Sequence, residues 1–131
     1  MAFERSNLDS YLRRLHTRYR FEQAWLIGSR ANNTHREDSD WDVVLYTVGH
    51  EIFIDMIDDP LIARDDIDLF VALSGTLAVQ PWQSPGCDGL RRKTLCGCVV
   101  DHQWINLEKP EQPTKAIQLW APEPKRVSNG R

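Results

Sequence analysis

Three short groups of residues in the first half of the chain carry side chains suited to binding a metal ion and a phosphate. They are the Gly28-Ser29 pair, the Asp40-Trp41-Asp42 triplet and the Asp66-Ile67-Asp68 triplet. Carboxylate oxygens are the ligands that Mg²⁺ and Mn²⁺ prefer. Glycine lets the backbone approach a ligand closely, and the amide and hydroxyl of Ser29 can donate to phosphate oxygens. Together these groups predict a site for a metal-bound nucleotide.

Strands must position these side chains. Residues 21–27, 43–48 and 67–73 are apolar, β-branched or aromatic runs next to turn residues, which predicts three strands. Side chains alternate along a strand, so Asp40 and Asp42 share a face if the second strand starts at Asp40, and Trp41 points to the opposite side, into the core. If the second and third strands are neighbours, three carboxylates converge within metal-binding range.

The charge distribution agrees with a cation site. The net charge is -3, but residues 37–68 hold eleven of the nineteen acidic residues and a single basic residue, Arg64. This segment therefore carries about -10, and the remainder about +7. Such a density of carboxylates must be solvated, partly protonated or neutralised by cations. A solvated acidic surface is the alternative interpretation of the charge alone.

The stretch from Gly28-Ser29-Arg30-Ala31 to Ser39-Asp40-Trp41-Asp42 resembles the signature of the polymerase-β nucleotidyltransferase superfamily, and it resembles the minimal, MNT-type members closely. The resemblance covers residues 21–73. It implies a polymerase-β-like α/β (α+β) fold, with a central mixed β-sheet flanked by helices. Family members often carry glycine a few residues after the Gly-Ser pair, where this chain has Asn32 and Asn33. Asparagine tolerates the left-handed backbone better than other residues, so the turn can survive.

The resemblance also implies roles for individual residues. Gly28 and Ser29 would grip the triphosphate, and Arg30 either reaches the triphosphate or faces solvent. Asp40 and Asp42 would bind two Mg²⁺ ions, with Mn²⁺ as a substitute, and Asp68 would complete the metal site beside the attacking hydroxyl or accept its proton. Asp66 competes for this third role. Asp68 is preferred because family members place this aspartate inside an apolar strand.

The activity implied by the resemblance is that of a nucleotidyltransferase of the EC 2.7.7 type. It would move AMP from ATP to a hydroxyl on a partner protein and release pyrophosphate, as in HEPN/MNT toxin–antitoxin pairs, where the small transferase modifies a tyrosine of a HEPN ribonuclease toxin. A small-molecule acceptor of the aminoglycoside kind and an RNA end are alternatives. A catalytically silent module that binds nucleotide or a partner is another.

The rest of the chain supports one soluble domain. We expect a nucleotidyltransferase domain over residues 1–109 and a proline-rich extension over 110–131 with a flexible end. No apolar run approaches the roughly 20 residues that span a bilayer, and the charged first twenty residues leave no room for a secretory signal, so a cytoplasmic protein without a membrane partner is expected. The net negative charge and the lack of a basic track disfavour a nucleic-acid partner.

Local patterns predict the remaining elements. A helix is expected over 7–20 with Ser6 as its N-cap, a short helix near 50–57, and a fourth strand over 95–100 that is extended through 104–107. Cysteines and a histidine in the second half of the chain could suggest zinc, but their spacing matches no common zinc motif: Cys87, Cys96, Cys98 and His102. Reduced thiols are the expected state.

Overall fold

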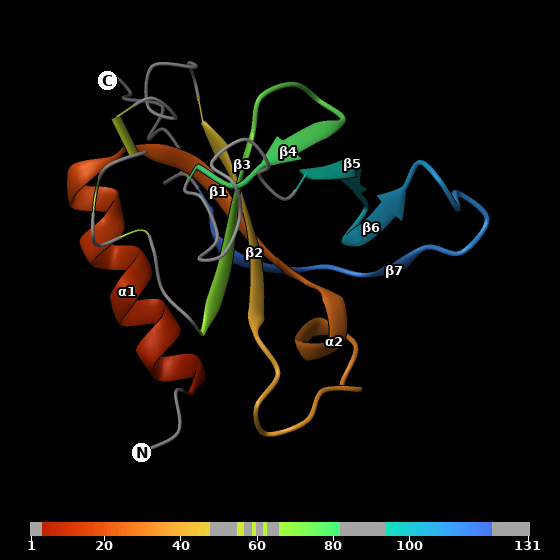
Figure 1. The fold of residues 1–131 in the computed structure, drawn as a ribbon, viewed down its shortest axis with the longest axis horizontal. Helices are drawn as coiled ribbons and strands as arrows, with labels where there is room; N and C mark the ends of the chain where they lie inside the picture. Colours follow the sequence, from red (N-terminus) through yellow and green to blue (C-terminus); the bar gives the residue numbers. More distant parts are fainter. Residues whose placement is uncertain are drawn as a thin grey trace, which may run out of the picture.

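The site is carried by a mixed sheet with one long helix packed on it (Figure 1). The computed structural model describes residues 4–47, 55–56, 59, 62, 66–81 and 94–121. Within these residues the elements are, in chain order, α1 (Arg5–Arg18), β1 (Phe21–Ile27), α2 (Gly28–Ala31), β2 (Trp41–Thr47), β3 (Ile67–Ala72), β4 (Leu77–Val79), β5 (Thr94–Val100), β6 (Gln103–Asn106), β7 (Thr114–Lys115) and β8 (Ile117–Trp120). The described strands form one sheet in the order β7-β6-β5-β4-β3-β2-β1-β8.

Three central strands determine where the acidic side chains lie. β1 runs antiparallel to β2, with Ile27 opposite Asp42. β2 runs parallel to β3, with Asp42 opposite Asp68. The other pairs in the sheet are antiparallel. The structure confirms the three strands predicted from the apolar runs, β1 to the residue and the other two within two residues at each end.

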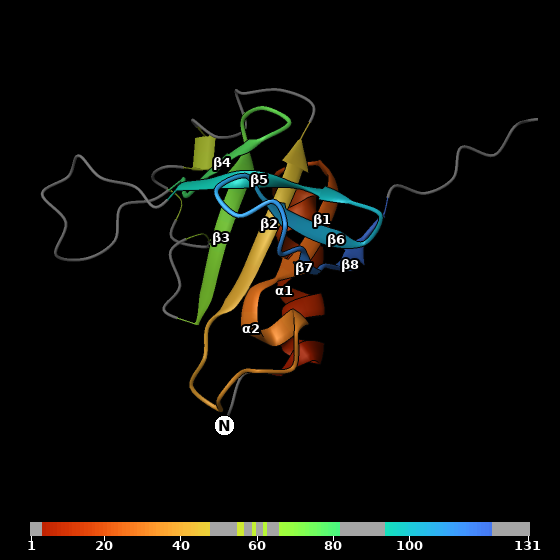
Figure 2. The same cartoon turned by 90° about the vertical axis from the view of Figure 1, so that its right-hand side faces the viewer.

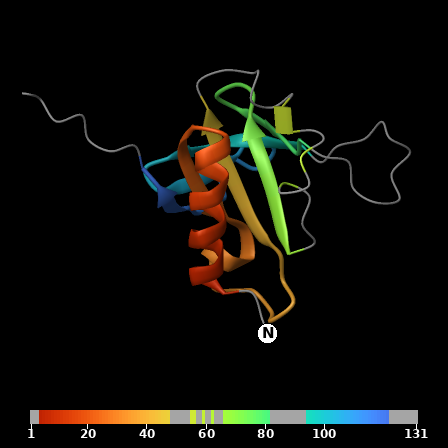
Figure 3. The same cartoon turned by 90° about the vertical axis from the view of Figure 1, so that its left-hand side faces the viewer.

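Helix α1 covers one face of the central strands (Figures 1 and 3). Its buried side chains recur at helical spacing, as an amphipathic helix requires. They are Leu8, Tyr11, Leu12 and Leu15, each fully buried. They pack in one cluster with strand residues that point to the same side, among them Trp41, Val43, Leu45, Leu69 and Val71. Trp41 is therefore a core residue, as strand alternation predicts.

The start of α1 differs from the prediction. Ser6 is not the N-cap but lies inside the first turn, because the helix begins at Arg5 and Glu4 is its N-cap. The backbone amide of Glu4 donates to Oδ1 of Asn7 at 2.8 Å. This bond satisfies a donor next to the helix end, where backbone groups lack helical partners, so the helix extends two residues further toward the N-terminus.

The opposite face of the sheet is partly covered by the hairpin of β5 and β6 (Figure 2). Trp104 of β6 packs there with Trp25, Val44 and Phe70. The hairpin corrects the predicted extension of the fourth strand, because the chain reverses after β5 and residues 103–106 form a separate antiparallel strand. Asp101 and His102 make the reversal with φ of 52° and 60°. Positive φ at both central residues suits a tight hairpin; Asp101 is common at the first of these positions, but His102 stands at the second, where glycine usually indicates the turn.

The last described residues join the sheet. β8 pairs antiparallel with β1, with Leu26 opposite Ile117, so part of the proline-rich extension forms an edge strand. β4 is a further short strand within the connection expected to be irregular. Most of the helix predicted near 50–57 lies outside the described residues. The two described residues of that range, Asp55 and Met56, are helical.

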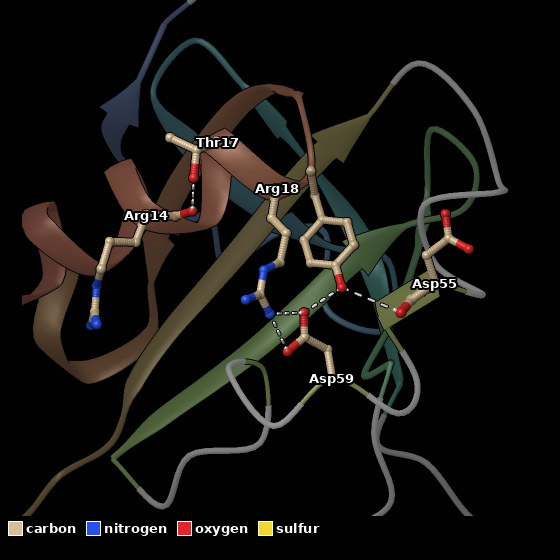
Figure 4. Close-up of polar contacts among 6 residues, drawn as sticks. Arg14, Thr17, Arg18, Asp55 and Asp59 are labelled. Atoms are coloured by element: carbon tan, nitrogen blue, oxygen red, sulfur yellow. Dashed lines mark hydrogen bonds and ion pairs between the residues drawn. The ribbon is translucent and has the colours of Figure 1, made fainter.

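A polar cluster attaches the connection between β2 and β3 to the end of α1 (Figure 4). Nη1 of Arg18 donates to both carboxylate oxygens of Asp59, at 2.7 and 2.8 Å. The Tyr19 hydroxyl donates to the same carboxylate and lies 3.3 Å from the carbonyl oxygen of Asp55. The Asp59 side chain is only 6% exposed, so its charge depends on these donors. Burial, followed by the Asp59 carboxylate, raises the pKa of Tyr19 to about 12.

We expect the free energy of unfolding to fall more steeply between pH 10 and pH 12 in the unmodified protein than in Tyr19→Phe. The Tyr19 phenol ionises near pH 10.0 in the unfolded chain and at about 12 in the folded one. Its contribution is thus fully present below pH 10 and is lost as the pH rises through 12. Urea unfolding followed by tryptophan fluorescence at several pH values measures the two slopes. If stability fell equally steeply with pH in both proteins, the raised pKa of Tyr19 would be contradicted.

Candidate active site

Two of the predicted carboxylates are neighbours on one face of the sheet. Asp42 and Asp68 are the second residues of the parallel strands β2 and β3 and stand opposite each other in the register. Paired residues point to the same side of a sheet, here the side opposite α1. Both residues are half-buried, whereas Asp40, which stands just before β2, is exposed. The central prediction, that neighbouring strands bring these aspartates together, holds for Asp42 and Asp68.

Gly28 comes very close to Asp42. It follows β1 directly and has a left-handed backbone, with φ of 74°. A Cβ atom at this position would overlap Oδ2 of Asp42. Only glycine avoids both the backbone strain and this overlap. The Gly-Ser turn and the carboxylate therefore form one cradle, in which the backbone of residue 28 lies directly against the acidic group.

Gly28→Ala should destabilise the fold and displace the Asp42 side chain. The left-handed backbone alone costs about 1–2 kcal/mol for a residue with a Cβ atom, and the overlap adds to that. Gly75→Ala is the matched control, because a Cβ atom there meets nothing within 4 Å. Thermal unfolding of both variants measures the difference. A Gly28→Ala protein as stable as Gly75→Ala would contradict the close approach of Gly28 to Asp42.

The turn after Gly28 is held by the two asparagines that replace the usual glycine. Asn33 has φ of 60°, a left-handed backbone that asparagine tolerates better than other residues with a Cβ atom. The Asn32 side chain donates to the carbonyl oxygen of Gly28 at 2.8 Å and accepts from the amide of Lys115 at 3.0 Å. Asn32 thereby connects the turn to β7, which the sequence pattern did not indicate. Ser29 is half-buried in this turn.

Arg30 is engaged within the protein. Its guanidinium donates to the carbonyl oxygen of Ser39 at 2.9 Å and to that of Glu37 at 3.1 Å, and it lies 4.4 Å from the centre of the Trp41 ring. These contacts hold the loop that leads into Asp40 and add a cation–π contact with the core tryptophan. The structure thus places Arg30 as a support for the loop. Its contact with a triphosphate stays a prediction.

One buried polar residue beside the carboxylates was not anticipated from the sequence. Gln80 follows β4 and its side chain is fully buried. Nε2 of Gln80 donates to Oδ1 of Asp68 at 3.1 Å. A glutamine after a three-residue strand carries no sequence signal, because the strand is too short to show a period. Its position follows only from the pairing of β4 with β3.

The donor set fits a hard divalent cation. In the described part of the chain, no three His, Cys, Asp or Glu side chains gather closely enough to hold a metal ion by themselves. This corrects the expectation that three carboxylates converge: Asp42 and Asp68 stand opposite each other, whereas Asp40 lies just before β2 and is exposed. Mg²⁺ is commonly held by one or two carboxylates together with substrate phosphates and water, so a protein site of three ligands is not required. The facing carboxylates of Asp42 and Asp68, with the Gly28 backbone against the first, meet that description.

Asp66 and Asp68 have different surroundings. Asp66 lies just before β3, and its backbone carbonyl accepts the amide of Trp41 at 3.0 Å, at the point where the parallel pair begins. Asp68 lies within β3, opposite Asp42. Both are half-buried. The register therefore favours Asp68 as the partner of Asp42, in line with the preference stated from the sequence.

The other candidate groups lie elsewhere. Cys96 is exposed, Cys98 is half-buried, and Cys87 lies outside the described residues. A hollow of about 420 Å³ on the same sheet face includes Cys98 and His102 in its lining, together with Gln23, Trp25, Tyr46, Gly75, Val99, Asp101 and Gln118. Tyr46 is four residues beyond Asp42 on β2, roughly 13 Å along the strand. The hollow is thus separate from the two facing carboxylates.

Comparison with known proteins identifies the domain. A family model described as a nucleotidyltransferase domain matches residues 8–95. A comparison with curated proteins finds no match. The described residues contain no helix with the length and apolar character needed to cross a membrane. The family match spans more than half of the chain and takes in the Gly28 turn and the facing aspartates of β2 and β3. The chain therefore belongs to the nucleotidyltransferase domain family and is an enzyme of that transferase class.

Proposed function

We propose that this nucleotidyltransferase moves AMP from ATP to a hydroxyl group on a partner protein. The observation that carries the proposal is the placement of Asp42 opposite Asp68, with the Gly28 backbone against Asp42. Family members typically use a divalent metal ion and a nucleoside triphosphate. We assign Asp40, Asp42 and Asp68 to hold Mg²⁺ or Mn²⁺, and Gly28 and Ser29 to bind the triphosphate.

In the proposed reaction the acceptor hydroxyl oxygen attacks the α-phosphorus of ATP. The new oxygen–phosphorus bond forms as the bond to the bridging oxygen of the β-phosphate breaks, and pyrophosphate leaves with that electron pair. Asp68 accepts the hydroxyl proton or passes it to solvent. The amide and hydroxyl of Ser29 donate to phosphate oxygens. When bound, the metal ions lower the pKa of the attacking hydroxyl and neutralise charge on the triphosphate.

A protein acceptor suits the exposure of the site. Asp40 is exposed, and Asp42 and Asp68 are half-buried at the start of their strands. In Figure 2 the start of β2 lies beside α2, away from the part of this face over which β5 and β6 pass. A tyrosine or another hydroxyl-bearing side chain on a partner surface could approach from that side. The resemblance to MNT proteins paired with HEPN toxins suggests such a toxin as the partner.

A small hydroxyl compound is the second candidate acceptor. The hollow near Tyr46 and His102, of about 420 Å³, is large enough for a small molecule on the same face, but it lies roughly 13 Å along β2 from Asp42. A compound held there would take part in the reaction only if it extended along the strand to the carboxylates. Aromatic and amide side chains in the lining of the hollow, such as Trp25 and Gln118, offer both apolar contact and hydrogen bonds. The two acceptor classes predict different products, one macromolecular and one soluble.

Transfer of label from α-labelled nucleoside triphosphates tests the function. The purified protein is incubated with Mg²⁺ and each of the four triphosphates, with and without lysate of its host or a co-encoded neighbour protein. Labelling of a protein supports the proposal if the labelling depends on Asp42. The triphosphate that is used most efficiently is then the donor. Label on RNA or on a small molecule names another acceptor. Metal-dependent nucleotide binding without any transfer would favour a silent binding module.

A further inference from the structure

Gln80 is the one fully buried polar side chain among the described residues. It follows β4, which pairs with β3 so that Val79 stands opposite Val71 and Ala78 opposite Ala72. Continuing this register sets Gln80 beside Phe70, two residues from Asp68 along β3 and on the same face. A long side chain reaches such a diagonal neighbour. This explains the bond of 3.1 Å from Nε2 of Gln80 to Oδ1 of Asp68.

The other end of the Gln80 amide shows that this arrangement is costly. Its Oε1 atom is buried and accepts no hydrogen bond from the described residues. Buried amides normally satisfy both ends, and an apolar side chain of similar size would avoid the cost. Among the described residues, only the donor end of this buried amide has a hydrogen-bond partner. That donor end faces a carboxylate of the candidate site.

We propose that Gln80 is a positioning residue for Asp68. Its N–H group fixes the orientation of the carboxylate, which can otherwise rotate about the Cα–Cβ and Cβ–Cγ bonds. Because the amide is neutral, it satisfies one oxygen without cancelling the negative charge, as an arginine or a lysine would. Residues that orient metal ligands in this way affect metal affinity strongly, so Gln80 should tune the metal site that the proposed function assigns to Asp68, on which this inference rests.

Replacing the Gln80 amide by an apolar side chain should lower the metal affinity without lowering the stability of the protein. Gln80→Met keeps the length of the side chain and removes both polar ends. The affinity for Mn²⁺ in the presence of a non-hydrolysable ATP analogue is expected to fall about 10-fold or more. Thermal stability should stay the same or rise, because the variant removes a buried acceptor that has no partner in the part of the chain that the structure describes. The metal concentration needed for half-maximal transfer should rise, while saturating metal restores much of kcat.

Mn²⁺ binding, measured by the electron paramagnetic resonance signal of the free ion, tests this directly. Gln103→Met, at an exposed position on β6, is the control for the substitution itself. Asp68→Asn defines the loss caused by removing the ligand charge. If Gln80→Met is unstable, Gln80→Leu gives the same comparison. Unchanged affinity in a folded Gln80 variant, with a clear loss in Asp68→Asn, overturns the positioning role alone. If Asp68→Asn also binds Mn²⁺ like the unmodified protein, the assigned metal site fails, and this inference with it.

Discussion

Asp42→Asn is expected to lower kcat/KM for nucleotidyl transfer about 1,000-fold or more, which corresponds to about 4 kcal/mol of transition-state stabilisation. The amide keeps the size and shape of the side chain but loses the charge that we assign to the metal ions. Asp42 faces Asp68 across the parallel pair and touches the Gly28 turn, so it lies where the metal and triphosphate sites meet. The charge of the pair, rather than its packing, is the property that the variant tests.

The matched control is Asp38→Asn. Asp38 is an exposed acid in the loop that leads to β2, four residues before Asp42. Its loss changes the net charge equally but leaves the facing pair intact, so activity should stay within about twofold of the starting value, as for most surface changes. Thermal unfolding of both variants checks that the fold is retained, so that a loss of activity can be attributed to the missing charge. Full activity of Asp42→Asn would refute the assigned mechanism.

Asp68→Asn and Asp66→Asn should differ widely in activity. Asp68→Asn is expected to lower kcat by at least about 100-fold, because it removes the carboxylate that we assign to the metal next to the attacking hydroxyl. Asp66→Asn should retain most of the activity. The backbone carbonyl of Asp66 accepts the amide of Trp41, and a change of side chain leaves that bond in place.

Steady-state kinetics at several Mg²⁺ concentrations separates these two variants. A loss in Asp66→Asn as large as that in Asp68→Asn would assign the third role to the residue before β3. A loss confined to Asp66→Asn would reverse the assignment. Circular dichroism of both variants controls for folding, since each substitution lies at the start of a strand that pairs with β2.

The predictions that the structure confirms are those based on strong local sequence patterns. β1 and β3 are runs of apolar residues next to turns, and their side chains alternate between two buried faces. Asn33 at positive φ and the buried Trp41 follow from residue type and from strand alternation. The pairing of Asp42 with Asp68 needed one further condition, that β2 and β3 be neighbours.

The elements that escaped prediction are short strands whose existence depends on the strands beside them in the sheet. β4, β7 and β8 have three, two and four residues, too few to show a hydrophobic period. β8 is a strand because β1 offers it an edge, and β6 is separate from β5 because the chain reverses at Asp101 and His102. Strand formation depends more on neighbours than on intrinsic preference, so these boundaries could not be read from composition.

The sequence by itself determined the chemistry of this protein: the residue types of the Gly28 turn and of the aspartates, and the strands that carry them. The tertiary structure decided which of these groups meet. It placed Asp42 opposite Asp68, directed Arg30 to the carbonyl oxygens of its own loop, and brought Gln80, which follows the short strand β4, to Asp68. The physical reason is that side-chain chemistry is local, whereas the partners of a buried polar group are set by strand register across the whole sheet.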